Sequence, residues 1–189
     1  MVDISTFTDS FGRPMMANEY IVYIQEPGGD FEFYDNVETL TIPGKGIGTV
    51  QRRLWGPMID FPYDRVFAGE IELTFSLTEE NATKSRMKFS KWMDKVILPE
   101  SGAINPNRGN YTGYIEIILP SAKSDQGKDP IRMVFQEVFP KNINPVSLGY
   151  GLQNEYIRQT VTFSFRDYME FADGGNIRSG TFGTGQLDL

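Results

Sequence analysis

Residues 69–98 change from a period of two to a period of three to four, which predicts a long strand followed by one amphipathic helix. On the strand, apolar side chains alternate with polar ones, as in a sheet with one buried and one solvated face. On the helix, expected at about 82–98, the apolar residues form a single stripe. The strand contributes Ile71, Leu73, Phe75 and Leu77, and the stripe contains Phe89, Trp92, Met93, Val96 and Ile97. Because the rest of the chain has β-like patterns, we expect the other segments to cover this stripe.

A second clear alternation runs through residues 155–168, where Ile157, Val161, Phe163 and Phe165 face away from a polar set. Shorter strands are expected at 20–24, 31–34, 37–42, 113–119 and 131–139, the last cut by Pro140. The first two form a hairpin through the turn sequence of residues 27–30. The predicted fold class is therefore mainly β with one flanking α-helix.

Residues 45–68 show no good periodicity and contain several glycines and prolines, so we expect a long loop. This loop carries many large apolar side chains, among them Leu54, Trp55, Met58, Phe61 and Tyr63. A loop of this length is generally functional, and an exposed apolar patch of this size favours a partner surface. The alternative is that the loop folds back as a lid on its own core.

The chain of 189 residues contains no cysteine and no histidine, and its formal charge is −7. These facts exclude thiolate metal sites and every Ser–His or Cys–His catalytic pair. The acidic charge argues against wrapping nucleic acid. No apolar run is long enough for a membrane helix, and residues 1–13 do not resemble a signal peptide.

No motif defines a catalytic, cofactor-binding or metal site. The glycine-rich run 44–48 lacks the ending of a phosphate-binding loop and has no helix after it. Glu70 with Glu72, or Glu79 with Glu80, could be a catalytic carboxylate pair, but such pairs are usually solvated surface. A stripe of lysines on the helix, Lys84, Lys88, Lys91 and Lys95, is either a solvated face or a docking surface for an acidic partner.

The order of several short motifs resembles the T4-like tail tube proteins of contractile-tailed phages. These motifs are Arg13-Pro14, Tyr20-Ile21-Val22, residues 40–43, Asp64-Arg65-Val66-Phe67, Glu79-Glu80-Asn81-Ala82, residues 86–92 and residues 160–168. The resemblance spans about residues 13–168, and 65–92 is its most specific part. The region 105–129 and the glycine-rich end of the chain depart from the family pattern.

The resemblance implies an antiparallel β-sandwich or half-barrel subunit that completes a large β-barrel in a hexameric ring. Rings would stack into a hollow tube that conducts DNA, a transient non-specific cargo, inside a contractile sheath. Type VI secretion and bacteriocin tubes share this architecture. Expected partners are further copies of the chain and the sheath, tape measure, baseplate and terminator proteins. The tube would belong to the virion, after assembly in the host cytoplasm and without membrane insertion by this chain.

The resemblance also assigns surfaces within a domain of residues 14–171, flanked by an extended arm (1–13) and a flexible tail (172–189). Lumen candidates are Glu70, Glu72, Thr74, Ser76, Thr78, Arg158, Thr160, Thr162 and Ser164. Ring-stacking candidates are Phe7, Phe11, Leu54, Trp55, Met58, Phe61 and Tyr63, and the sheath-facing candidates are the four lysines. Alternation alone does not decide which strand face is the lumen.

Two alternative functions remain open. A baseplate tube initiator or a tail terminator of the same fold would form one ring and stop. A soluble β-barrel binding module or carboxylate hydrolase would be a monomer with a ligand pocket.

Overall fold

The computed structural model describes residues 17–53, 55–78, 83–119, 131–146, 148–149 and 156–171. Its strands are β1 (Ile21–Gln25), β2 (Phe31–Tyr34), β3 (Val37–Thr41), β4 (Lys45–Arg52), β5 (Ile59–Phe67), β6 (Glu70–Leu77), β7 (Gly113–Leu119), β8 (Ile131–Ile143), β9 (Ile157–Ser164) and β10 (Asp167–Phe171). Its helical elements are the π-helical turn η1 (Thr83–Met87), the α-helix α2 (Lys88–Val96) and the 3₁₀ turn η2 (Arg108–Asn110). The predicted arm and the glycine-rich tail lie outside the described residues.

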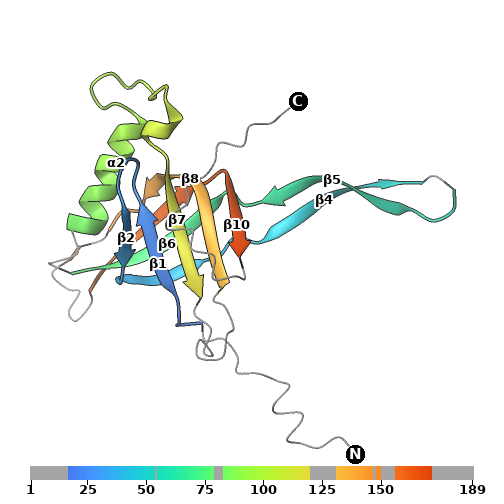
Figure 1. The fold of residues 1–189 in the computed structure, drawn as a ribbon, viewed down its shortest axis with the longest axis horizontal. Coiled ribbons are helices and arrows are strands. Elements are labelled where there is room, and N and C mark those ends of the chain that lie inside the picture. The colour runs from blue at the N-terminus through green and yellow to red at the C-terminus, as the bar shows by residue number, and fades with distance from the viewer. Residues whose placement is uncertain are drawn as a thin grey trace, which may run out of the picture.

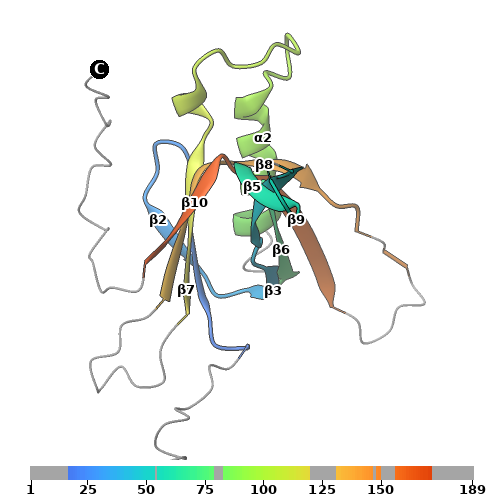
Figure 2. The same ribbon diagram turned by 90° about the vertical axis from the view of Figure 1, so that its right-hand side faces the viewer.

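The strands confirm the predicted fold class, because they form antiparallel sheets flanked by α2 (Figures 1 and 2). One path, β2-β1-β7-β8-β9-β6-β3, bends within β8, and β10 also pairs with β8. We call β2, β1, β7, β10 and the start of β8 the first sheet. The second sheet contains the end of β8 with β9, β6 and β3. Both sheets contribute to one hydrophobic core.

The bend in β8 corrects two sequence predictions. Pro140 does not end this strand, because the register with β9 shifts between Pro140 and Asn142 and the bulge accommodates the proline. The predicted strand 155–168 is instead divided into β9 and β10, which pair with the later and earlier parts of β8. At the bend, Glu137 has a φ of 52°, and its carboxylate forms ion pairs with Arg108 and Arg166.

Helix α2 covers the buried face of the second sheet. The Phe89 ring lies 5.2 Å from Phe75 and 5.3 Å from Phe163, measured between centroids. The Trp92 indole Nε1 donates a hydrogen bond to the Tyr111 carbonyl oxygen over 2.6 Å. Ile97, predicted to belong to the apolar stripe, is extended and half exposed because the helix ends at Val96. No helix among the described residues is long and apolar enough to cross a bilayer.

Gly113, at the start of β7, permits the close approach of β1 and α2. A Cβ atom at this position would lie 2.0 Å from the Gln25 carbonyl oxygen and 2.9 Å from the Trp92 ring. A backbone contact of this kind has no room for a side chain. Glycine is therefore required where the first sheet meets the helix.

Residues 45–68 are not the predicted loop, because most of them form a two-stranded hairpin, β4–β5, that projects from the body (Figure 1). The alternative of a lid is also wrong, since Trp55 is 95% exposed. The register shifts after Gly48, where Tyr63 is the extra residue and its ring lies against Gly48. A bulge displaces the alternation of one strand relative to the other, and this displacement hid the β pattern in the sequence.

Candidate assembly surfaces

The register of β6 and β9 brings most of the predicted lumen residues onto one face. The opposed pairs are Glu70 with Ser164, Glu72 with Thr162, Thr74 with Thr160, and Ser76 with Arg158. Thr78 follows the end of β6. The same register adds three residues that the sequence analysis missed, Thr39 and Thr41 from β3 and Asn142 from β8. We call this surface the polar face; only knowledge of the strand pairing could have found its added members.

The polar face and helix α2 lie on opposite sides of the second sheet. Residues that alternate with the polar set, such as Leu73 and Val161, are fully buried in the core that α2 covers. The members of the polar face are exposed or partly exposed. The hydroxyl oxygens of Thr74 and Thr160 lie 3.1 Å apart across the strands. The subunit therefore presents a surface of short hydroxyl and carboxylate side chains away from its helix.

The two cations of the polar face, Arg158 and Lys141, are each paired with a carboxylate. The Arg158 Nε donates to the Glu38 carboxylate over 2.9 Å, and its NH2 group donates to the Tyr156 hydroxyl over 2.6 Å. The pKa of Arg158 is raised above its ordinary value, mainly by the hydrogen bond to Tyr156 and to a lesser extent by attraction to Glu38. Lys141 forms an ion pair with Glu70.

One member of the candidate carboxylate pair Glu70 and Glu72 therefore takes part in an ion pair. Glu70 and Glu72 border a small hollow together with Thr41, Pro43, Ala68 and Thr162. Glu70 is held by Lys141, and the described residues contain no group of three or more carboxylates that could hold a metal ion.

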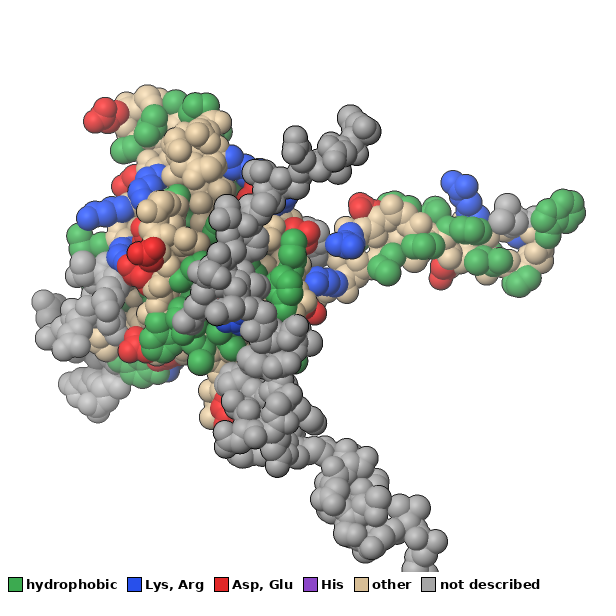
Figure 3. All heavy atoms as spheres, viewed as in Figure 1, with side chains coloured by type: hydrophobic (Ala, Val, Ile, Leu, Met, Phe, Trp, Pro, Cys, Tyr) green, Lys and Arg blue, Asp and Glu red, His purple; other side chains and the backbone are tan. Residues whose placement is uncertain are grey.

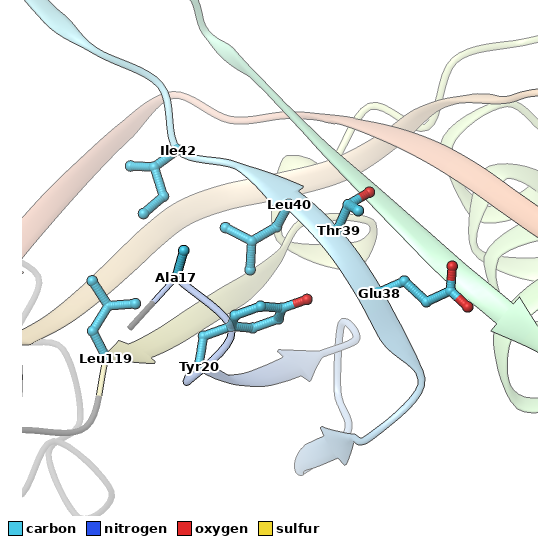
Figure 4. A pocket seen from close by; sticks show the side chains of 7 residues that line it. All are labelled: Ala17, Tyr20, Glu38, Thr39, Leu40, Ile42 and Leu119. Atoms are coloured by element: carbon cyan, nitrogen blue, oxygen red, sulfur yellow. The ribbon is translucent and has the colours of Figure 1, made fainter. Parts of the chain in front are cut away.

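The second sheet has two edges within the described part of the chain, at β3 and at the end of β8. A groove of about 440 Å³ follows the β3 edge (Figure 4). Its lining residues are Ala17, Tyr20, Glu38, Thr39, Leu40, Ile42 and Leu119. Tyr20 donates a hydrogen bond to the Val37 carbonyl oxygen over 3.0 Å, and burial, followed by the nearby Glu38 charge, raises its pKa.

The hairpin β4–β5 exposes apolar side chains along its length (Figure 3). Of the predicted stacking residues, Trp55, Met58 and Tyr63 are exposed and Phe61 is partly exposed. Four further apolar side chains of the hairpin that are not among the stacking candidates are also exposed, namely Ile47, Val50, Ile59 and Val66. The register places Val50 opposite Phe61 on one hairpin face, which also carries Ile59 and Val66. Phe7, Phe11 and Leu54 lie outside the described residues.

The root of the hairpin is fixed to β10. The Tyr168 hydroxyl donates to the Pro43 carbonyl oxygen over 2.7 Å. The Lys45 Nζ lies 4.0 Å from the centre of the Tyr168 ring and 3.4 Å from the Glu170 carboxylate. The pKa of Tyr168 is raised, mainly by burial and to a lesser extent by the Glu170 charge. These contacts hold the first residues of β4 against the body.

The predicted lysine stripe is only partly available for docking. Lys88 forms an ion pair with Glu32 on β2. Lys91 and Lys95 are exposed on α2, and the side chain of Lys84 lies outside the described part of the chain. Among the described side chains of the stripe, Lys91 and Lys95 are therefore the exposed ones.

A mainly β subunit with one flanking helix, an open polar sheet and a projecting hairpin has the fold of tube-forming proteins. A chain of the extended PVC sheath/tube terminator of an extracellular contractile injection system is similar, with a TM-score of 0.61 and 15% identity. The match covers 85% of this chain and 98% of that one. A chain of the extended PVC sheath–tube complex has a TM-score of 0.60 and 14% identity, and the match covers 92% of this chain and 100% of that one. The SPP1 tail tube protein has a TM-score of 0.55 and 9% identity, and the match covers 85% of this chain and 80% of that one.

A sequence model of the phage tail tube protein family matches residues 5–171, and the chain belongs to this family. No curated protein matches the chain. The chain is thus a structural subunit of a phage tail tube, and its place is the virion tail. The match to the family and the similarity to solved structures give no support to a soluble binding module or a carboxylate hydrolase.

Proposed function

We propose that the chain closes into a hexameric ring through the two edges of its second sheet. An edge strand offers unpaired backbone groups to another chain, and a closed barrel removes such edges. In this ring, β3 of one subunit pairs with the end of β8 of the next. The polar face then lines the lumen, because α2 covers the opposite side of the same sheet.

The groove beside β3 supports this joint. Its apolar members, including Leu40, Ile42 and Leu119, lie next to the edge strand, where a neighbouring subunit would place side chains. Burial of such surface contributes about 25 cal/mol for each Å² removed from water. Backbone pairing and apolar contact would therefore stabilise the same joint.

The hairpin β4–β5 carries the contacts between stacked rings. With eight residues in β4, the hairpin reaches about 27 Å from its root at the ordinary rise of a strand. Its exposed apolar residues, above all Trp55, are suited to burial against another subunit. Phe7, Phe11 and Leu54 belong to the same proposed set. Stacked rings of this kind form a hollow tube.

The tube conducts DNA and is enclosed by a contractile sheath. Short hydroxyls and carboxylates on the polar face offer phosphate groups little attraction. The α2 side, with Lys91 and Lys95, faces outward toward the sheath. Within this arrangement the tape measure protein occupies the lumen during assembly, and baseplate and terminator proteins cap the two ends. The role of the chain is structural and not enzymatic.

One observation carries the proposal: the polar face lies opposite the helix on a sheet whose two edges are β3 and the end of β8. Because the chain has no cysteine, introduced cysteines report the ring joint without background. We expect T41C/N142C, or T39C/N142C in a shifted register, to give disulfide-linked oligomers up to a hexamer under oxidising conditions. The control T41C/E100C places its second cysteine beyond α2. Monomers in both T41C/N142C and T39C/N142C would contradict the ring.

A further inference from the structure

The polar face contains two long cationic side chains, Arg158 and Lys141, although a lumen for DNA should not hold phosphate. Exposed fractions are 60% for the Arg158 side chain and 55% for that of Lys141. Cations this accessible would bind a passing polyanion through release of its counterions. The arrangement of their carboxylate partners shows how the surface avoids this outcome.

Arg158 lies flat across the sheet. It belongs to β9 and is opposed by Ser76 on β6, yet its ion pair is made with Glu38 on β3. The side chain must therefore cross β6, and the small Ser76 leaves room for it. The Tyr156 hydroxyl accepts a second hydrogen bond, and the Tyr156 ring lies 4.6 Å from the guanidinium carbon. The donors of Arg158 are thus directed along the surface.

Lys141 has a corresponding arrangement on the other side of the sheet. It lies at the β8 bulge and pairs with Glu70 on β6, so its side chain crosses β9. At this point Ser164, the residue opposite Glu70, is again small. Counting Glu38, Glu70 and Glu72 against Lys141 and Arg158, the charged residues of the face sum to −1 for each subunit.

We propose that Glu38 and Glu70 are guard carboxylates, whose role is to neutralise Arg158 and Lys141 so that a duplex polyanion slides past the polar face. This inference rests on the proposed conduction of DNA. Stability does not explain the pairs, since ion pairs between exposed side chains contribute little to it. Replacing both glutamates with glutamine changes the face from −1 to +1 and leaves two bare cations on it.

The test measures binding of a short fluorescent DNA duplex to the dispersed full-length chain by anisotropy, at about 50 mM salt and upward. Wild type should not bind. The variant E38Q/E70Q should bind, and log K should fall with log salt at a slope of about −1.8, the value for two phosphates neutralised. The control D94N/E100Q makes the same change in net charge on the helix side and should not bind. The variant E38Q/E70Q/K141Q/R158Q should lose the binding.

Absence of binding by a folded E38Q/E70Q, or equal binding by D94N/E100Q, overturns the guard role. If E38Q/E70Q does not fold, the single variants E38Q and E70Q replace it, each with about half the slope. Binding by wild type also overturns the inference. Failure of the ring itself is seen separately, as monomers in the cysteine cross-linking experiment, and leaves the DNA measurement interpretable.

Discussion

The hydroxyl of Tyr168 donates a hydrogen bond to the carbonyl oxygen of Pro43, 2.7 Å away, and so joins β10 to the residues that precede the hairpin. Both residues are buried. In Y168F the Pro43 carbonyl loses its partner, which should cost about 1–3 kcal/mol. We expect the loss to loosen the hairpin root, so that amides of β4 and β5 exchange hydrogen faster than in wild type. Y63F, an exposed change on the hairpin itself, is the control and should leave exchange unchanged.

The close contact at Gly113 gives a second prediction. G113A places a methyl group 2.0 Å from the Gln25 carbonyl oxygen, so β1 and β7 must separate. Overpacking usually costs about 1–3 kcal/mol, and a contact with backbone should reach or exceed the upper value. Urea unfolding measures the change. G44A is the matched control, because its methyl group meets no atom within 4 Å. Equal stability of the two variants would contradict this account of the β1–β7–α2 joint.

Phe89 should be the residue of α2 on which packing depends most. Its ring contacts Tyr34, Phe75 and Phe163, with centroids 5.2–5.9 Å away. F89A should lower the free energy of unfolding by about 3–5 kcal/mol. I97A removes an apolar side chain that is half exposed, and its cost should stay below about 1 kcal/mol. A similar loss in both variants, measured by chemical denaturation, would mean that the helix is not held through Phe89.

Stability should also fall at alkaline pH because of Tyr34. Burial, followed by the charges of Glu32 and Glu26, raises the pKa of this phenol. The folded state therefore favours the neutral form. The contribution of Tyr34 is complete below its unfolded pKa of about 10 and is lost as pH rises from there toward the folded pKa.

Between pH 10 and 12 the Tm of the Y34F variant should therefore fall less than that of wild type. This window begins at the unfolded pKa of about 10. Part of the alkaline loss should remain, because burial also raises the pKa of Tyr168. Y63F serves as the control at an exposed position. Parallel Tm curves for Y34F and wild type would exclude Tyr34 as the origin of the effect.

Trp55 tests the role of the hairpin in stacking. Since its side chain is 95% exposed, W55A should leave the unfolding free energy of the subunit unchanged. If Trp55 is an interface anchor, the same change should weaken association by about 2 kcal/mol or more. Sedimentation against concentration separates the two quantities. M87A, an exposed change beside α2, should alter neither. A loss of folded, soluble W55A would instead indicate a role in the core.

Sequence alone predicted the elements that have one buried face. Ile71, Leu73 and Phe75 alternate with polar residues, and Phe89 and Trp92 share one helix face, because the core imposes these periods. The polar side of β6 and β9 was predicted for the same reason. The pairing of these strands, which aligns Thr74 with Thr160, depends on tertiary structure and was not visible.

Two kinds of feature escaped prediction for physical reasons. Bulges at Gly48–Thr49 and at Pro140–Asn142 interrupt the alternation, so a hairpin was interpreted as a loop and a strand as ended by proline. Charge pairs such as Lys141 with Glu70 join residues that are 71 positions apart. Local patterns cannot report contacts of that separation.

The central claim is that the polar face lines a ring closed through β3 and the end of β8. Electron microscopy of the purified full-length chain tests it most directly. We expect hollow rings or tubes with sixfold symmetry in end view, with β6 and β9 on the inner wall and α2 outside in the averaged map. A dispersed monomer at high concentration, or a ring with α2 on its inner wall, would contradict the account.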